Sequence, residues 1–231
     1  MRMGKYFVGA EIECPWEELP SCKEKEILPE MRHMTLNFIG EKKEKPVCLT
    51  HPLVIGSAGY FDGMLFLTHA VAYHAVFLSN ALKRDGFLPH VTIARGENHK
   101  ALEWQKWFQP LPFYFKAIHL YKSLENNQYE KLESCSLNAP FEAREHTDDL
   151  AFIVRGKSLD EIFIHSMIAL AFSFPQTLQF FEKKGVRSIK EVAQELNRLI
   201  ARMDTAIGAP FKAVSYSKKV KQGEWEMIID V

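Results

Sequence analysis

Two copies of a His-x-Thr tripeptide constrain the fold of this chain more than any other feature. They span residues 33–35 (HMT) and 90–92 (HVT), and each is followed by a further apolar residue. On a β-strand the side chains alternate between two faces, so the histidine and threonine of each copy share one face. The pattern therefore predicts two related strands, each with an apolar face for a core and a His/Thr face for a cleft.

The residue types of the two motifs favour acid–base chemistry on a phosphate. Histidine, with an ordinary pKa of about 6.5, can serve as an acid or as a base near neutral pH. Threonine hydroxyls can donate to non-bridging phosphate oxygens as negative charge builds on them. His33, Thr35, His90 and Thr92 are thus the candidate site, and this chemistry requires no metal. The alternative is that each motif is an ordinary polar pair on the surface of a strand.

The other histidines show no comparable pattern. His69 and His74 lie near or on a predicted helix and are interpreted as surface or packing residues. No partner is predicted for His51, His99, His119 or His165.

Composition limits the kinds of protein that this chain can be. A hydrophobic content of 47% is enough for a packed core, and the 29 basic residues balance the 29 acidic ones. Any nucleic acid is therefore expected at a local site and not along a broad cationic face. The four cysteines show no Cys-x-x-Cys spacing, no signal peptide is recognised and no apolar run has the length of a membrane span. We expect a cytoplasmic protein without a membrane partner.

Periodicity predicts strands and helices in both halves of the chain. The expected strands are Tyr6–Ile12, Met31–Ile39, Met64–Thr68, Leu88–Ala94, Phe113–Ser123, Gln128–Leu137, Leu150–Val154, Phe211–Lys219 and Glu224–Val231. The expected helices are Ala70–Arg84, Ala101–Phe108, a segment from Ser158 to about Phe172, and Ser188–Asp204. Glu17–Pro29 is expected to be a loop or short helix, and Glu41–Pro46 a solvated turn.

Residues 1–140 resemble the 2H phosphoesterase superfamily, specifically the RNA 2′,3′-cyclic phosphodiesterases. The resemblance rests on the segments YFVGAEI, MRHMTLNFIGE, FLPHVTIAR and IHLYKSLENNQYEKLESCSL. It implies an α+β fold of two βαβ-type lobes around a cleft, and hydrolysis of RNA 2′,3′-cyclic phosphates to 2′-phosphates without a cofactor. It also implies that His33 is the general acid for the leaving 3′ oxygen and His90 the base on water. Thr35 and Thr92 would bind the phosphate, and Arg95 matches a family arginine that contacts it.

The second unit, residues 143–231, contains acidic residues at its two ends. Asp148 and Asp149 precede a predicted strand, and the chain ends on Asp230 and Val231. Oxygen ligands of this kind suit a hard divalent cation if the two segments meet, although acidic residues at strand starts are usually solvated.

The same unit resembles a shortened archease domain, another small α+β fold. The resemblance rests on EHTDDLAFIVRGKSLDEIFIHSMIALAF and PFKAVSYSKKVKQGEWEMIIDV. It implies a calcium or magnesium ion held by Asp149, Asp230 and the Val231 carboxylate, with Lys212 at the position of a family lysine. It further implies the tRNA-splicing ligase as a partner, beside RNA ends. Two alternatives stay open: a non-catalytic protein that binds RNA ends or assists the ligase, and a 2H enzyme that acts on small cyclic nucleotides or 2′–5′ linkages.

Overall fold

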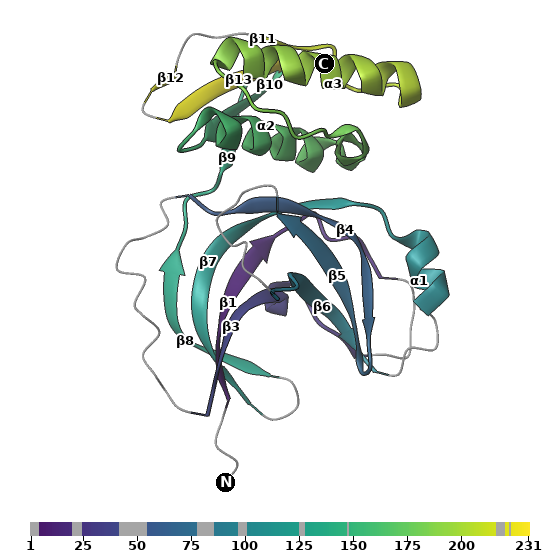
Figure 1. Ribbon diagram of the computed structural model, residues 1–231, viewed down its shortest axis with the longest axis vertical. Coiled ribbons are helices and arrows are strands. Elements are labelled where there is room, and N and C mark those ends of the chain that lie inside the picture. Colours follow the sequence, from purple (N-terminus) through teal and green to yellow (C-terminus); the bar gives the residue numbers. More distant parts are fainter. Residues whose placement is uncertain are drawn as a thin grey trace.

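The computed structural model describes residues 5–19, 25–41, 55–77, 86–96, 101–124, 128–146, 148–215, 220–221 and 223–231. Its lower part in Figure 1 is built from curved strands, and its upper part contains the two long helices and a second, smaller sheet. Apart from Glu41, the turn expected at Glu41–Pro46 lies outside the described residues.

A closed antiparallel barrel forms the larger part of the molecule. Six strands pair in the order β1-β3-β6-β5-β4-β7, and β7 pairs again with β1, which closes the ring. The bounds are β1 Tyr6–Glu13, β2 Lys25–Glu26, β3 His33–Gly40, β4 Ala58–Leu67, β5 Ala70–Phe77, β6 His90–Arg95, β7 Leu111–Ser123 and β8 Tyr129–Ser136, with η1 at Pro29–Met31 and α1 at Ala101–Trp107. β8 extends the sheet beyond β7, and β2 adds to β6.

The expectation of two βαβ-type lobes is therefore wrong. Its main error was the helix predicted for Ala70–Arg84, because residues 70–77 form strand β5, which pairs with β4 and β6. Val71 and Ala75, four positions apart, were taken as one face of a helix. Residues four apart also share a face of a strand, and Tyr73 between them is buried as well. The alternation of Val71, Tyr73 and Ala75 into the barrel core thus distinguishes the strand.

The barrel core receives the apolar faces of the two motif strands. Met34, Val91 and Ile93 are completely buried, and Leu36 nearly so, in a cluster with the aromatic rings of β4, β5 and β7. The alternation predicted for the motif strands is thereby confirmed, and it leaves the histidines and threonines on the opposite face of the sheet.

The C-terminal part contains a separate antiparallel sheet and two long helices. Its elements are β9 Phe141–Arg144, β10 Leu150–Arg155, α2 Leu159–Ser173, η4 Pro175–Phe180, α3 Ile189–Ile207, β11 Ala213–Ser215, β12 Val220–Lys221 and β13 Glu224–Asp230, and the sheet order is β11-β13-β10-β9. Ser158 caps α2 by accepting a hydrogen bond from the Glu161 amide at 3.2 Å, and Ser188 caps α3 from the Glu191 amide at 3.1 Å. Both helix starts were predicted from the sequence and are confirmed.

Helix α2 joins the two parts. Residues 162–171 are all buried, so the helix has no solvent face, as expected for a helix packed on every side. It lies between the barrel and the second sheet (Figure 1), where it contacts β4 and β7 of the barrel as well as β10 and α3. Tyr114 of β7 packs against Phe172 with a ring separation of 5.6 Å. The division into units at residues 140–143 coincides with the start of the second sheet and stays a prediction. In the described part of the chain, no helix is both long and apolar enough to cross a membrane.

Candidate functional site

The two His-x-Thr motifs lie side by side on neighbouring strands. β3 and β6 are antiparallel, and Met34 pairs with Val91, so the central residues of the two motifs oppose each other. One step along this register, His33 lies beside Thr92 and Thr35 beside His90, with Cβ atoms about 4.5–5.5 Å apart. The four polar side chains predicted from the sequence thus share one face around a local two-fold axis.

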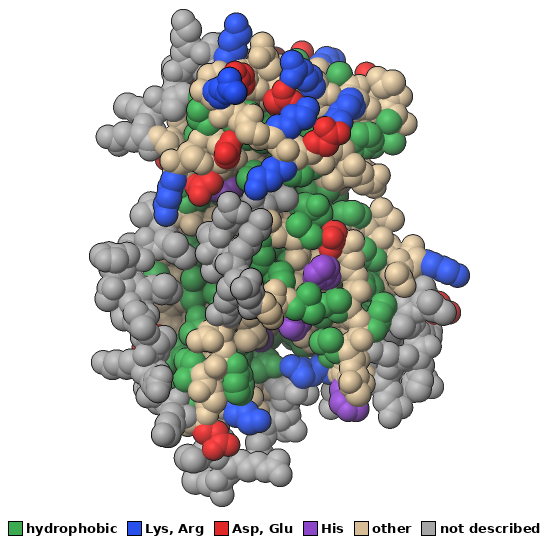
Figure 2. Space-filling view, viewed as in Figure 1, with side chains coloured by type: hydrophobic (Ala, Val, Ile, Leu, Met, Phe, Trp, Pro, Cys, Tyr) green, Lys and Arg blue, Asp and Glu red, His purple; other side chains and the backbone are tan. Residues whose placement is uncertain are grey.

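A pocket of about 360 Å³ opens on this face. It is lined by Lys5, Phe7, Ile27, Met31, His33, Thr35, Phe38, His90, Thr92, Arg95, Ser123 and Tyr129. All five residues predicted for the phosphate site therefore line the same cavity. Figure 2 shows histidine side chains on the barrel half of the molecule, whereas the visible basic and acidic side chains gather mainly over the C-terminal half.

The loop before β3 orients His33. The His33 Nδ1 atom lies 3.0 Å from the Met31 carbonyl, which can only accept, so Nδ1 carries the proton and Nε2 is left for chemistry. The buried Arg32 side chain holds this loop by donating to the Ile27 carbonyl and to Glu26, each at 2.9 Å. The orientation of His33 is therefore set by backbone that Arg32 fixes.

The segment before β6 orients His90 in the same way. Its Nδ1 atom lies 3.0 Å from the Leu88 carbonyl, so the Nε2 atom of His90 is also left for chemistry. The Pro89 carbonyl accepts a hydrogen bond from the Ala75 amide at 3.0 Å, which ties this segment to β5. Each motif histidine thus donates to the carbonyl two residues before it.

Three aromatic rings contact His33. Phe7 stacks on it at a ring separation of 5.1 Å, Tyr121 lies tilted against it at 5.0 Å, and Tyr129 meets it edge-on at 4.9 Å. Burial in this aromatic cage lowers the pKa of His33 below its ordinary value, and the nearby charge of Arg95 lowers it further. His33 is therefore largely neutral at neutral pH in the free protein.

Gly9 makes room for this cage. A Cβ atom at Gly9 would lie 3.0 Å from Cε2 of Tyr121 and 3.3 Å from Cδ2 of His33. Both contacts are tighter than most Cβ atoms make, so a side chain at this position would push the two rings by a few tenths of an ångström. Phe7 and Gly9 belong to the YFVGAEI segment, but only the folded structure shows that they lie against His33.

Arg95 belongs to the His33 side of the pocket in space, although it follows His90 along the chain. Its Nη2 atom donates to the Tyr129 hydroxyl at 2.9 Å, while its buried Nε atom has no protein partner among the described residues. Phe38, with 61% of its surface exposed, lines the same pocket. A guanidinium for phosphate and an exposed ring for a base lie at one site.

His119 has partners that sequence reasoning missed. It is buried, its Nδ1 atom lies 2.7 Å from the Ser134 hydroxyl, and its Nε2 atom lies 2.9 Å from Glu11. Lys131 also donates to Glu11, at 2.6 Å. His119 packs edge-on against Tyr121 at 5.4 Å, so this network supports the aromatic cage from behind. The contacts join β1, β7 and β8, and the sequence spacing gives no signal for them.

The acidic residues predicted for a cation lie at one end of the second sheet. Leu150 pairs with Ile229, so Asp149 and Asp230 follow at the next position of the register. The Lys212 ammonium lies 3.7 Å from the Asp230 carboxylate and 2.6 Å from the Val231 oxygen, and Asp149 faces His146 at 3.6 Å. Among the described residues no three His, Cys, Asp or Glu side chains form a cation site. Because an ammonium already sits between two of the expected ligands, the arrangement does not fit a divalent cation.

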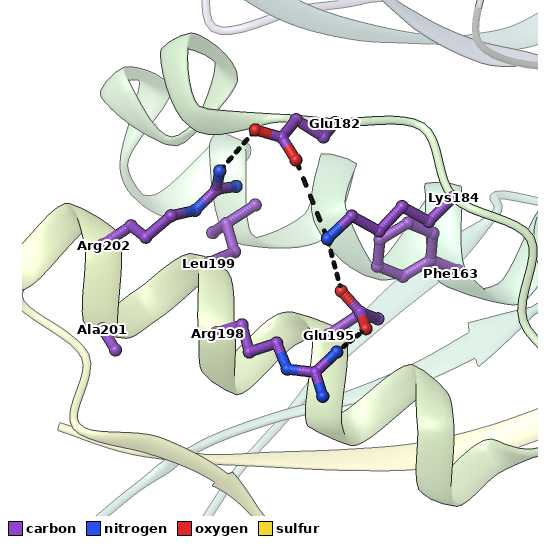
Figure 3. A pocket seen from close by; sticks show the side chains of 8 residues that line it. All are labelled: Phe163, Glu182, Lys184, Glu195, Arg198, Leu199, Ala201 and Arg202. Carbon is purple, nitrogen blue, oxygen red and sulfur yellow. Dashed lines mark hydrogen bonds and ion pairs between the residues drawn. The ribbon is translucent and has the colours of Figure 1, made fainter.

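A second pocket, of about 300 Å³, lies over α3 in the C-terminal part (Figure 3). Its charged side chains form a chain of ion pairs in which Arg202 binds Glu182, Lys184 lies between Glu182 and Glu195, and Arg198 binds Glu195. These cations are neutralised by neighbouring carboxylates, so the pocket offers no counterpart to the His/Thr site.

No protein-family model matches the chain, and neither a curated protein nor a solved structure matches it. The resemblances to the 2H phosphoesterases and to archease stay predictions.

Proposed function

We propose that this protein opens 2′,3′-cyclic phosphates at RNA ends, leaving 2′-phosphates. The observation that carries the proposal is the pair of histidines on one face, His33 and His90, each with Nδ1 fixed by a carbonyl and Nε2 directed to chemistry. Two such nitrogens on either side of one phosphate supply both the base and the acid that hydrolysis of a phosphodiester needs.

The reaction can be written with the roles that the sequence resemblance gives. The Nε2 atom of His90 takes a proton from water as the water oxygen attacks phosphorus. The bond from phosphorus to the 3′ oxygen breaks, and the Nε2 atom of protonated His33 gives its proton to that oxygen. Thr35, Thr92 and Arg95 contact the non-bridging oxygens as negative charge builds on them. Proton and charge balance without a metal.

The lining of the pocket favours a nucleotide over a smaller phosphodiester. Phe38 presents an exposed ring in the same pocket as the residues proposed to bind phosphate. Exposed aromatic rings of this kind stack on unpaired bases. Lys5 adds a cation to the lining. A cyclic mononucleotide and a 2′–5′ linkage also carry a phosphodiester and a base. Measured rates therefore decide which of these substrates and the RNA end the protein prefers.

The test is turnover of 2′,3′-cyclic nucleotides and of RNA with a cyclic end, in the presence of a chelator, with the product identified by phosphorus NMR. We expect a 2′-phosphate product in undiminished yield with the chelator. Tight binding of the RNA without any product would overturn the proposal in favour of a non-catalytic protein that binds RNA ends.

A further inference from the structure

His74 stands directly beside His90 on the face that carries the pocket. β5 and β6 are antiparallel, and His74 pairs with His90 in their register. Paired residues of neighbouring strands project their side chains to the same face, with Cβ atoms about 4.5–5.5 Å apart. Sequence analysis predicts only a surface or packing role for His74, because the predicted helix Ala70–Arg84 includes it.

A β-bulge brings a carboxylate to this histidine. In the pairing of β4 with β5, Phe61 opposes Ala75 and Gly63 opposes His74, so Asp62 is the extra residue. Bulges of this kind redirect a side chain and are frequent beside functional sites. The Asp62 carboxylate lies 3.2 Å from Nδ1 of His74, with 40% and 32% of the two side chains exposed.

This contact fixes the ring as the carbonyls fix the two motif histidines. The Asp62 carboxylate faces Nδ1 of His74, so the other ring nitrogen, Nε2, is left for a ligand. The His74 side of the site is open with respect to the described residues, because a Cβ atom at the opposing Gly63 would meet none of them within 4 Å.

The His33 side also has a histidine and a carboxylate, but their positions are exchanged. There the carboxylate of Glu11 pairs in register with His33, and its histidine partner, His119, is buried behind it. Lys131 neutralises Glu11 as well. In the described part of the chain, therefore, the His90 side has a further accessible histidine nitrogen and the His33 side does not.

We propose that His74, held by Asp62, binds a second phosphate of the substrate, so that the site prefers an RNA end of two or more nucleotides to a mononucleotide. The terminal phosphate lies between β3 and β6, and β5 is one strand farther, about 5 Å beyond His90. A ligand that also reaches His74 needs a second hydrogen-bond acceptor about one strand spacing beyond its terminal phosphate. The phosphodiester that joins the last two nucleotides of an RNA provides such an acceptor. This inference rests on the proposed function for the position of the first phosphate.

The experiment measures binding of two products, a nucleoside 2′-phosphate and a dinucleotide ending in a 2′-phosphate, by calorimetry with the full chain. In His74→Gln we expect affinity for the dinucleotide to fall about tenfold, the size of one hydrogen bond to a charged group, with no change for the mononucleotide. Asp62→Asn should give a smaller loss with the same selectivity. His69→Gln, at an exposed position in the turn after β4, is the matched control and should change neither.

Three results would overturn the inference: equal losses for both ligands in His74→Gln, no loss for either, or wild-type protein that binds the two ligands equally. These affinities are measured with reaction products, so they do not depend on whether the protein hydrolyses a substrate. A protein that binds the dinucleotide through His74 but hydrolyses nothing retains this inference and loses the proposed function.

Discussion

The His33 and His90 sides of the pocket are built from the same motif but differ in their surroundings. His33 lies against Phe7, Tyr121 and Tyr129, whereas His90 has no such set of rings among its described neighbours. His90 instead has His74 beside it, and Asp62 lies against the far side of His74.

This difference teaches that a repeated motif need not make two equivalent groups. The local two-fold axis through Met34 and Val91 gives both histidines the same orientation. Their environments then separate them, because burial lowers the pKa of His33. In the free protein, burial thus disfavours the protonated form in which the proposed reaction uses His33, and a bound phosphate, as a nearby negative charge, favours that form.

The largest effect that distinguishes the two sides is expected from added side chains. Gly9→Ala should lower kcat by up to about 100-fold, because the added Cβ atom forces Tyr121 and His33 to shift by a few tenths of an ångström and spoils the alignment of His33. Gly63→Ala, on the open His90 side, should leave kcat unchanged. Steady-state kinetics of both variants, with circular dichroism to verify folding, checks this. Equal kcat values in the two variants would contradict the description of the His33 side as closely packed and the His90 side as open.

Arg95 should affect binding on the His33 side. Arg95→Gln removes the guanidinium that Tyr129 holds, and we expect an increase in KM of about tenfold, the size of one charge-assisted hydrogen bond. Tyr129→Phe keeps the ring beside His33 and removes only the hydroxyl, so it should give a smaller increase. An unchanged KM in Arg95→Gln would exclude Arg95 from the phosphate site.

The pKa of His33 should lie below its ordinary value in the free protein. Proton–carbon NMR titration of the imidazole signals, assigned with His33→Gln, measures it directly. Because the cage excludes water, the protonated ring is disfavoured, and the midpoint of the His33 titration should fall below pH 6.5. A His33 pKa at or above 6.5 would show that the cage stabilises the charged ring.

The smallest effect concerns stability in acid. Burial lowers the pKa values of His33, His119 and His165, so the unfolded chain binds more protons than the folded one below about pH 6.5. The stabilising contribution is complete above the unfolded value and is lost as the pH falls through the folded values. Denaturant unfolding at pH 7.5 and 5.5 should show lower stability at the acidic pH, and His165→Gln should weaken that dependence. Equal stability at both values would contradict the burial of these rings.

Much of the site could be predicted from the sequence, because strand alternation is a local property. His33, Thr35, His90 and Thr92 share a face for the same reason that Met34 and Val91 share the core. The helix starts at Ser158 and Ser188 were predictable because their caps are local too.

The barrel and the surroundings of the histidines could not be predicted, because both depend on register between distant strands. Val71 and Ala75 fit a helix or a strand equally well, and only the pairing of β5 with β4 and β6 decides between them. The contacts of His33 with Tyr121 and Tyr129 join residues far apart in the chain. The same holds for the Asp62 bulge, which a single sequence does not reveal.

The cooperation of His33 and His90 on one phosphate is tested most directly by turnover of a 2′,3′-cyclic nucleotide in chelator. The proteins to compare are wild type, His33→Ala, His90→Ala and the double variant. Each single variant should lose about 10²–10⁴-fold in kcat, and the double variant should lose little more than the worse single one, since the two groups act as a unit. Undiminished turnover in either single variant would contradict a shared role for the two histidines.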